Sequence, residues 1–270
     1  MDTIIQILAR ELGRSEAHVE NVVRLIDEGN TIPFIARYRK ELHGAMDDTA
    51  LRTLADRLQY LRNLDKRREE VKSAIEGQGK LTEELSAAID AAATLAEVED
   101  LYRPYRQKRR TRATVAREKG LEPLAELLFA QAADGPAPEE AAGAFVDPEK
   151  GVETAEDALQ GASDIIAERI SDDADIRKRL RELVWKKGYL VSAAAAKEPE
   201  DTVYRLYYAF RSPLNRVQGH QVLAINRGER EGVLKVSVEM EREAALIPVR
   251  RAVLNLSLIH ISEPTRPEPI

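Results

Sequence analysis

The densest group of side chains suited to binding a charged ligand lies between residues 100 and 119. In this segment eight basic residues stand against Asp100 and Glu118. The eight are Arg103, Arg106, Lys108, Arg109, Arg110, Arg112, Arg117 and Lys119. Arginine can grip a phosphate through two parallel N–H donors, and Tyr102 and Tyr105 add rings on which bases can stack. The segment therefore predicts contact with the backbone of RNA or DNA, without sequence readout.

The same cations have a second interpretation, because an acidic stretch follows them. Residues 134–175 contain thirteen acidic and two basic side chains, within a chain of net charge −6. Ion pairs between the two segments would then hold a helical bundle together. Guanidiniums open to water favour nucleic-acid binding, whereas guanidiniums turned inward against carboxylates favour a structural network, and the sequence leaves both open.

Two smaller basic clusters raise the same question. Arg37, Arg39 and Lys40 are further candidates for nucleic-acid binding, although packing of this segment around Phe34 and Ile35 is the favoured interpretation. The basic residues between 177 and 187 lie on a predicted helix and are interpreted as its solvated face. Trp185 of the same helix is expected to anchor packing.

No combination of residues predicts catalysis. The chain has no cysteine, and its four histidines, at 18, 43, 220 and 260, do not have the spacing of zinc ligands. A nucleophile with a base, a phosphate-binding glycine loop and a carboxylate set for two metals are not recognisable. We therefore expect a non-catalytic chain without a metal, a cofactor or a small-molecule substrate.

The apolar pattern also bears on where the chain resides. No stretch approaches the roughly 18 apolar residues of a membrane span, and the first residues resemble no secretion signal. We expect a cytoplasmic protein with no membrane partner.

The elements that position these side chains are expected to be mainly helical, forming an array or bundle. Charged residues make up 33% of the chain and aromatic residues only 5%, which suits long solvent-facing helices. An apolar stripe ends at Gly13, and Ser15 can start a second helix, so the beginning is helix-turn-helix-like, a pattern that any αα-hairpin also gives. Leu51, Leu54 and Leu58 predict a long helix after Asp47 and Asp48.

Further along, helices give way to a small mixed α/β element. Thr154 with Asp157 is expected to open a helix, Ser171 to cap the next one, and Gly188 to end it. From Tyr189 onwards, segments 189–191, 202–210 and 232–241 resemble strands, while 220–232 favours a helix.

These observations predict the following division of the chain. Residues 1–132 form an N-terminal helical domain, 133–188 an acidic loop with a helical continuation, and 189–255 the small α/β element. Residues 256–270 include LSLIHISEPTR, which resembles an in-frame translation of a sequencing adapter. We interpret that tail as an artefact and expect the natural gene to continue beyond it.

Four stretches in the same order resemble the Tex family of transcription accessory proteins. They are TIPFIARYRKE at 31–41, DLYRPYRQKRRTRATVAREKGLEPLA at 100–125, DIIAERISDDADIRKRLRE at 164–182 and VLAINRGEREG at 222–232. Segment 207–212 departs from the more acidic version expected in relatives. The resemblance implies the N-terminal portion of a protein that continues into a ribonuclease-H-like domain, helix-hairpin-helix elements and an OB-type RNA-binding domain.

The resemblance implies a nucleic-acid-binding accessory factor that contacts the backbone of RNA or DNA and the transcription machinery. The alternative is a helical scaffold that binds RNA polymerase or a ribosome-associated partner. Nucleic-acid binding would then be confined to the C-terminal OB-type domain that this chain does not include.

Overall fold

The computed structural model describes residues 3–132, 135–196 and 202–254. The proposed adapter tail at 256–270, with His260, lies outside these residues. The chain divides into two compact units, residues 1–106 and 107–270, which are described separately. The division falls inside the basic segment, and the finer boundaries at 132 and 188 stay predictions.

Unit 1 begins with short helices whose ends follow the sequence. They are α1 (Ile4–Leu12), α2 (Glu16–Asp27) and α3 (Ile32–Tyr38). Thr3 forms a capping box with Gln6, Gly13 ends α1 with a φ of 61°, and the Ser15 hydroxyl accepts from the backbone N–H of His18 at 3.3 Å. The predicted helical hairpin is present, while its use in reading DNA stays a prediction.

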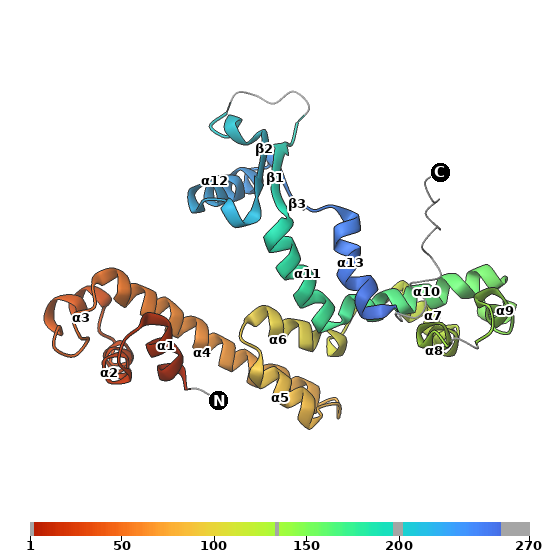
Figure 1. Cartoon of the computed structure of the whole chain (residues 1–270), viewed down its shortest axis with the longest axis horizontal. Helices are drawn as coiled ribbons and strands as arrows, with labels where there is room; N and C mark the ends of the chain where they lie inside the picture. Colours follow the sequence, from red (N-terminus) through yellow and green to blue (C-terminus); the bar gives the residue numbers. More distant parts are fainter. Residues whose placement is uncertain (1–2, 133–134, 197–201, 255–270) are drawn as a thin grey trace, which may run out of the picture. The chain divides into compact units, whose positions relative to one another are not determined.

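The long helix α4 (Asp48–Glu76) organises the rest of unit 1. It starts at Asp47, whose carboxylate accepts from the N–H of Ala50 at 2.7 Å. Its buried stripe, which includes Leu51, Leu54 and Leu58, packs against α1 to α3 and against α5 (Glu83–Ala91) and α6 (Leu95–Tyr102) (Figure 1). A 3₁₀ turn, Arg103–Tyr105, follows α6.

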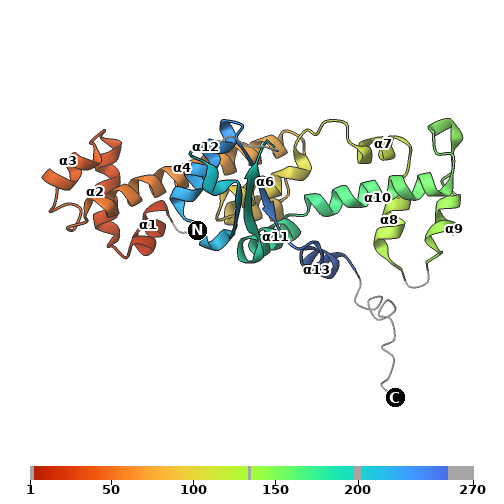
Figure 2. The same ribbon diagram turned by 90° about the horizontal axis from the view of Figure 1, so that it is seen from above.

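Unit 2 opens with helices gathered around α10. They are α7 (Arg112–Glu118), α8 (Glu122–Ala130), α9 (Pro138–Gly143) and α10 (Ala155–Asp172), and α10 runs beside the other three (Figure 2). Their shared core consists largely of alanines, with Leu121 and Leu124. A Cβ placed on Gly161 would lie 2.3 Å from Cδ1 of Leu121. The helices therefore approach closely because these positions are small.

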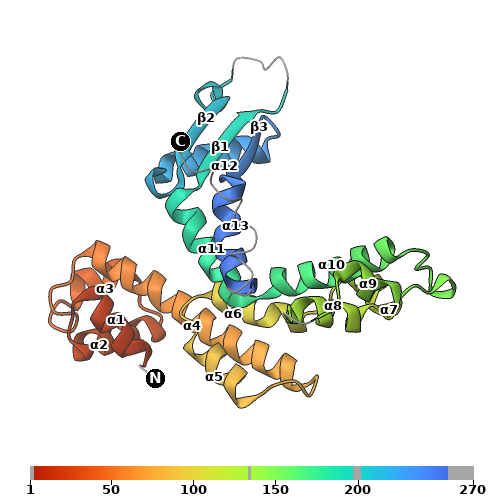
Figure 3. The same cartoon turned by 45° about the vertical axis from the view of Figure 1, so that its right-hand side comes forward.

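The remainder of unit 2 is the mixed element that the sequence predicts. Helix α11 (Ala174–Lys187) leads into a three-stranded antiparallel sheet of order β2-β1-β3. Its strands are β1 (Tyr189–Ala194), β2 (Ala209–Pro213) and β3 (Leu234–Glu239). Val191 faces Arg211 on one side and Ser237 on the other. Helix α12 (Gly219–Arg230) packs against β3, and α13 (Arg242–Val253) against α11 (Figure 3).

Three local expectations are wrong. Ser171 does not cap α11, because α10 continues to Asp172 and the Asp173 carboxylate accepts from the N–H of Ile176 at 2.8 Å. Segment 202–208 contains a 3₁₀ turn, and the strand begins only at Ala209. Trp185 is 61% exposed because it lies outside the apolar stripe of α11.

None of the helices in the described ranges is long and apolar enough to cross a membrane.

Candidate nucleic-acid interface

The part of the basic segment that lies in unit 2 runs from Lys108 to Lys119. Residues 107–111 have no regular secondary structure, and α7 follows them. The Thr111 hydroxyl accepts from the N–H of Thr114 at 3.1 Å and so fixes the start of α7. The basic side chains around this cap point into two different environments, towards α10 or towards water.

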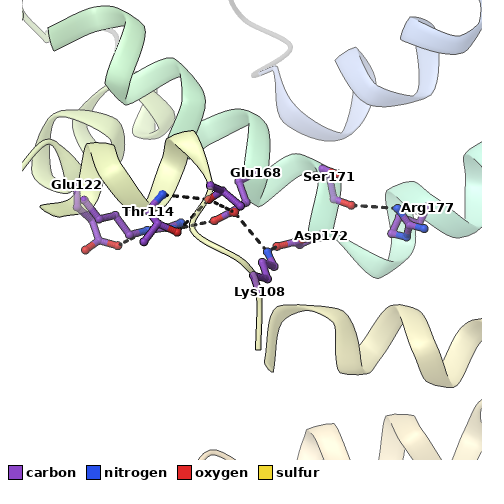
Figure 4. Close-up of polar contacts among 9 residues, drawn as sticks. Lys108, Thr114, Glu122, Glu168, Ser171, Asp172 and Arg177 are labelled. Atoms are coloured by element: carbon purple, nitrogen blue, oxygen red, sulfur yellow. Dashed lines mark hydrogen bonds and ion pairs between the residues drawn. The ribbon is translucent and has the colours of Figure 1, made fainter. Parts of the chain in front are cut away.

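Lys108 turns towards Glu168 and Asp172 of α10 (Figure 4), and Arg117 also pairs with Glu168. Arg117 Nη1 donates to Glu168 Oε2 at 2.7 Å, and Thr111 Oγ1 donates to Glu168 Oε1 at 3.0 Å. Lys108 Nζ pairs with Asp172 and lies 3.6 Å from Glu168 Oε1. The Glu168 and Asp172 side chains are only 15% and 12% exposed. These two cations therefore fit the structural interpretation of the segment.

Opposing influences set the charge of Glu168. Burial raises its pKa, but the hydrogen bonds from Arg117 and Thr111 and the charge of Lys108 outweigh burial, so the pKa lies below the ordinary value. The carboxylate is consequently charged at neutral pH. Arg117 and Lys108 thus already have carboxylate partners within the fold.

Arg109, Arg110 and Arg112 face water instead. The Arg112 side chain is 86% exposed, and its Nε lies 3.6 Å from Asp164 Oδ1, beyond hydrogen-bonding distance. Arg110 donates to Glu118 Oε2 at 2.6 Å and remains largely exposed. Arg109 is exposed and forms no side-chain hydrogen bond or ion pair with any residue that the structure describes. These three guanidiniums fit the nucleic-acid interpretation.

A cavity of about 420 Å³ lies beside these arginines, between α7 and α10. Arg110, Arg112 and Lys119 line it together with Asp157 and Asp164. Lys119 Nζ donates to the carbonyl oxygen of Gly151 at 2.7 Å, so one of the three cations is held in place. The cavity offers donors for a phosphate or sugar beside acceptors for an amino group.

The remaining predicted residues belong to unit 1. Arg103, Arg106, Arg37 and Lys40 are exposed. Ile35 is buried as expected, whereas Phe34 is exposed, and the Arg39 guanidinium carbon lies 5.5 Å from the centroid of the Phe34 ring. The expected burial of Phe34 is therefore wrong, and among the three cations of this cluster Arg39 is the one that is only half-exposed. Their part in nucleic-acid binding stays a prediction.

The acidic partners on α10 were not singled out from the sequence. Asp164, Glu168 and Asp172 recur every four residues and so share one face of a helix. This four-residue spacing could have identified an acidic helix face, whereas the total charge of 134–175 does not show which carboxylates share a face. Among the described residues, no group of three or more histidines and carboxylates could hold a metal ion.

Comparisons with known proteins match most of the chain. Residues 2–76 match the family described as Tex-like protein N-terminal domain, and residues 134–260 match the Tex central region-like family.

Three relatives illustrate the range of similarity. Protein tex of Bordetella pertussis is 46% identical, over 89% of this chain and 30% of its own length. Transcriptional accessory protein Tex of Neisseria gonorrhoeae is 40% identical, over 88% of this chain and 31% of its own length. The human S1 RNA-binding domain-containing protein 1 is 32% identical, over 88% of this chain and 24% of its own length. The chain thus spans a third or less of the length of these relatives.

Proposed function

The chain belongs to the Tex family, and from that premise we propose that it is part of a transcription accessory factor that binds the backbone of RNA or DNA. The relatives named as a transcriptional accessory protein and as an S1 RNA-binding domain-containing protein support this class of function. The observation that carries the proposal is the outward orientation of Arg109, Arg110 and Arg112 in unit 2.

The outward arginines can meet a phosphate at little cost. Arg109 has no ion pair to break among the described residues, and Arg112 Nε lies 3.6 Å from Asp164 Oδ1, so that contact is weak. Arg110 would exchange its pair with Glu118, in which both side chains are mostly exposed. Each phosphate that they neutralise releases counterions, which favours association at low salt.

The two inward cations, Lys108 and Arg117, hold the backbone that carries the outward arginines. Lys108 and Arg117 tie both ends of segment 108–117 to α10 through Asp172 and Glu168. The three outward arginines lie between these ties, so binding has less chain entropy to remove. The structural network and the nucleic-acid surface are thus two parts of one segment.

A protein-binding scaffold is the second candidate function. It is favoured by large apolar side chains that unit 2 leaves open to water, among them Leu206, Leu223 and Trp185. RNA polymerase and ribosome-associated proteins are the partners that this alternative implies. Binding to such a partner would depend little on salt.

Fluorescence anisotropy with labelled single-stranded RNA and duplex DNA, over a salt series, tests the proposal. We expect an affinity that falls steeply with salt, and the variant R109E/R110E/R112E should lower the logarithmic slope by roughly 1 for each phosphate that it no longer neutralises. The matched control R14E/K80E/K235E reverses three exposed cations elsewhere and should retain binding. Unchanged affinity in the folded R109E/R110E/R112E variant would overturn the proposal.

A further inference from the structure

A second cavity, of about 360 Å³, lies between α11 and α13 in unit 2. Leu183 of α11 and Ile247 of α13 give it an apolar lining, and Arg179, Lys186, Lys187 and Arg251 surround them. We refer to these six residues as the α11–α13 groove. The proposed nucleic-acid surface uses none of them.

The spacing of these residues explains why they share one surface. On α11 the residues of the groove follow the helical repeat. Leu183, Lys186 and Lys187 come four, seven and eight positions after Arg179, so all four lie on one side of the helix. Ile247 and Arg251 are four positions apart and share one side of α13. Two helix faces of the same mixed character, apolar and basic, therefore border the groove.

The charge of the groove is not balanced within the described chain. One carboxylate, Glu182, lines it beside the four cations. None of the four cationic side chains forms an ion pair or a hydrogen bond with another described residue. Ile247 is 48% exposed, so an apolar surface lies open beside the uncompensated charge. A ligand that fits must supply both carboxylates or phosphates and an apolar group.

We propose that the α11–α13 groove binds an acidic helical segment of a partner protein, in which aliphatic side chains at helical spacing are separated by aspartates or glutamates. The aliphatic side chains would cover Leu183 and Ile247, and the carboxylates would meet the four cations. This is the arrangement by which amphipathic segments enter grooves between helices. A nucleic-acid backbone would satisfy the charges alone and leave Ile247 open to water, so the apolar lining favours the peptide.

Binding of a synthetic peptide tests this proposal. The probe is a fluorescein-labelled peptide in which leucines at helical spacing are separated by glutamates, and a glutamate-only peptide of equal charge is its comparison. We expect the leucine-containing peptide to bind the full chain. The affinity of the glutamate-only peptide should be lower by about tenfold or more.

Two variants separate the charged and apolar contributions. K186E/K187E/R251E should weaken binding of the leucine-containing peptide about tenfold or more, and I247S should weaken it about fivefold. The matched controls are R14E/K80E/K235E for charge and V238S for an exposed apolar residue, and both should bind as the unaltered chain does. Circular dichroism and melting temperatures check that each variant is folded.

Four outcomes would overturn the proposal. The first is that the peptide does not bind, and the second is that the glutamate-only peptide binds equally well and I247S has no effect. The third is that single-stranded RNA displaces the peptide from the groove. The fourth is that the chain associates with itself and K186E/K187E/R251E abolishes this association. The last two would assign the groove to nucleic acid and to a second copy of the chain, respectively.

Discussion

Leu54, Leu58 and Leu61 fill the contacts of α4 in unit 1, whereas Ala116 and Ala162 lie where α7 and α10 meet in unit 2. A leucine buries far more apolar surface than an alanine, so the first contact draws more on the hydrophobic effect. The second brings helix backbones closer together and leaves less apolar area to stabilise them.

Two examples of ion pairs, one from each region, differ in how far water reaches them. In unit 1 the pair of Arg62 with Asp27, at 2.7 Å, lies on the surface with both side chains about half exposed. In unit 2 the carboxylates of Glu168 and Asp172 are mostly covered at the contact between segment 108–117 and α10. Ion pairs thus join helices in both units, as Lys72 with Asp90 does in unit 1, but the carboxylates that hold segment 108–117 are the more covered.

The largest effect should follow removal of an aliphatic side chain from unit 1. L54A truncates a fully buried leucine and should lower the free energy of unfolding of unit 1 by about 2–5 kcal/mol, because less apolar surface is buried and a cavity is left behind. Urea unfolding followed by circular dichroism, with hydrogen exchange measured along α4, checks this. The exposed L206A should change stability by less than about 0.5 kcal/mol. A small effect of L54A would remove the contrast between the cores.

Neutralising the charged contact of unit 2 should have the next largest effect. E168Q leaves Arg117 and Lys108 without their shared carboxylate and should destabilise unit 2 by about 1–3 kcal/mol. The control E122Q alters a more exposed carboxylate 3.5 Å from the same arginine and should cost less than about 0.5 kcal/mol. Equal effects of the two substitutions, measured by urea unfolding, would contradict the structural importance of Glu168.

At acidic pH, E168Q and the unaltered chain should have the same free energy of unfolding. Because the pKa of Glu168 is lowered in the fold, its stabilisation is complete above the ordinary carboxyl pKa and disappears as the pH falls through the lowered value. The two unfolding free energies should therefore approach each other as the pH falls below about 4 and meet once it is below the lowered pKa. Curves that stay parallel over this range would show that the charge of Glu168 is not what stabilises the contact.

The smallest effect should come from the surface pair of unit 1. R62A removes both hydrogen bonds to Asp27, at 2.7 and 2.8 Å, yet should cost only about 0–1 kcal/mol, because water solvates the separated groups. Thermal melts at low and high salt check this, and the small difference should shrink further as salt rises. A destabilisation comparable to that of E168Q would break the distinction between surface and contact ion pairs.

Much of the fold could be predicted because its signals are local. The helix starts at Ser15 and Thr154, the long helix after Asp47 and its leucine stripe depend on residues a turn apart, and the structure confirms them. Ser171 misled because two capping residues, Ser171 and Asp173, stand close together and only the continuation of α10 decides between them. Local spacing cannot settle such a choice.

The candidate site was predictable as a segment but not as a set of orientations. Arg109 and Arg117 belong to the same run of positive charge, yet one faces water and the other meets Glu168. The contact that separates them joins residues more than fifty positions apart, which composition and periodicity do not reveal. Both interpretations made from the sequence therefore describe part of the segment.

The exposed position of Trp185 has a practical consequence, because this is the single tryptophan of the chain. Its indole lies on α11 in unit 2, so intrinsic emission excited at the red edge of protein absorption originates there and not in residues 1–106. A collisional quencher such as iodide reaches a half-open indole readily. One unlabelled sample thus carries its own optical reporter for the second unit, while the first remains dark in the same measurement.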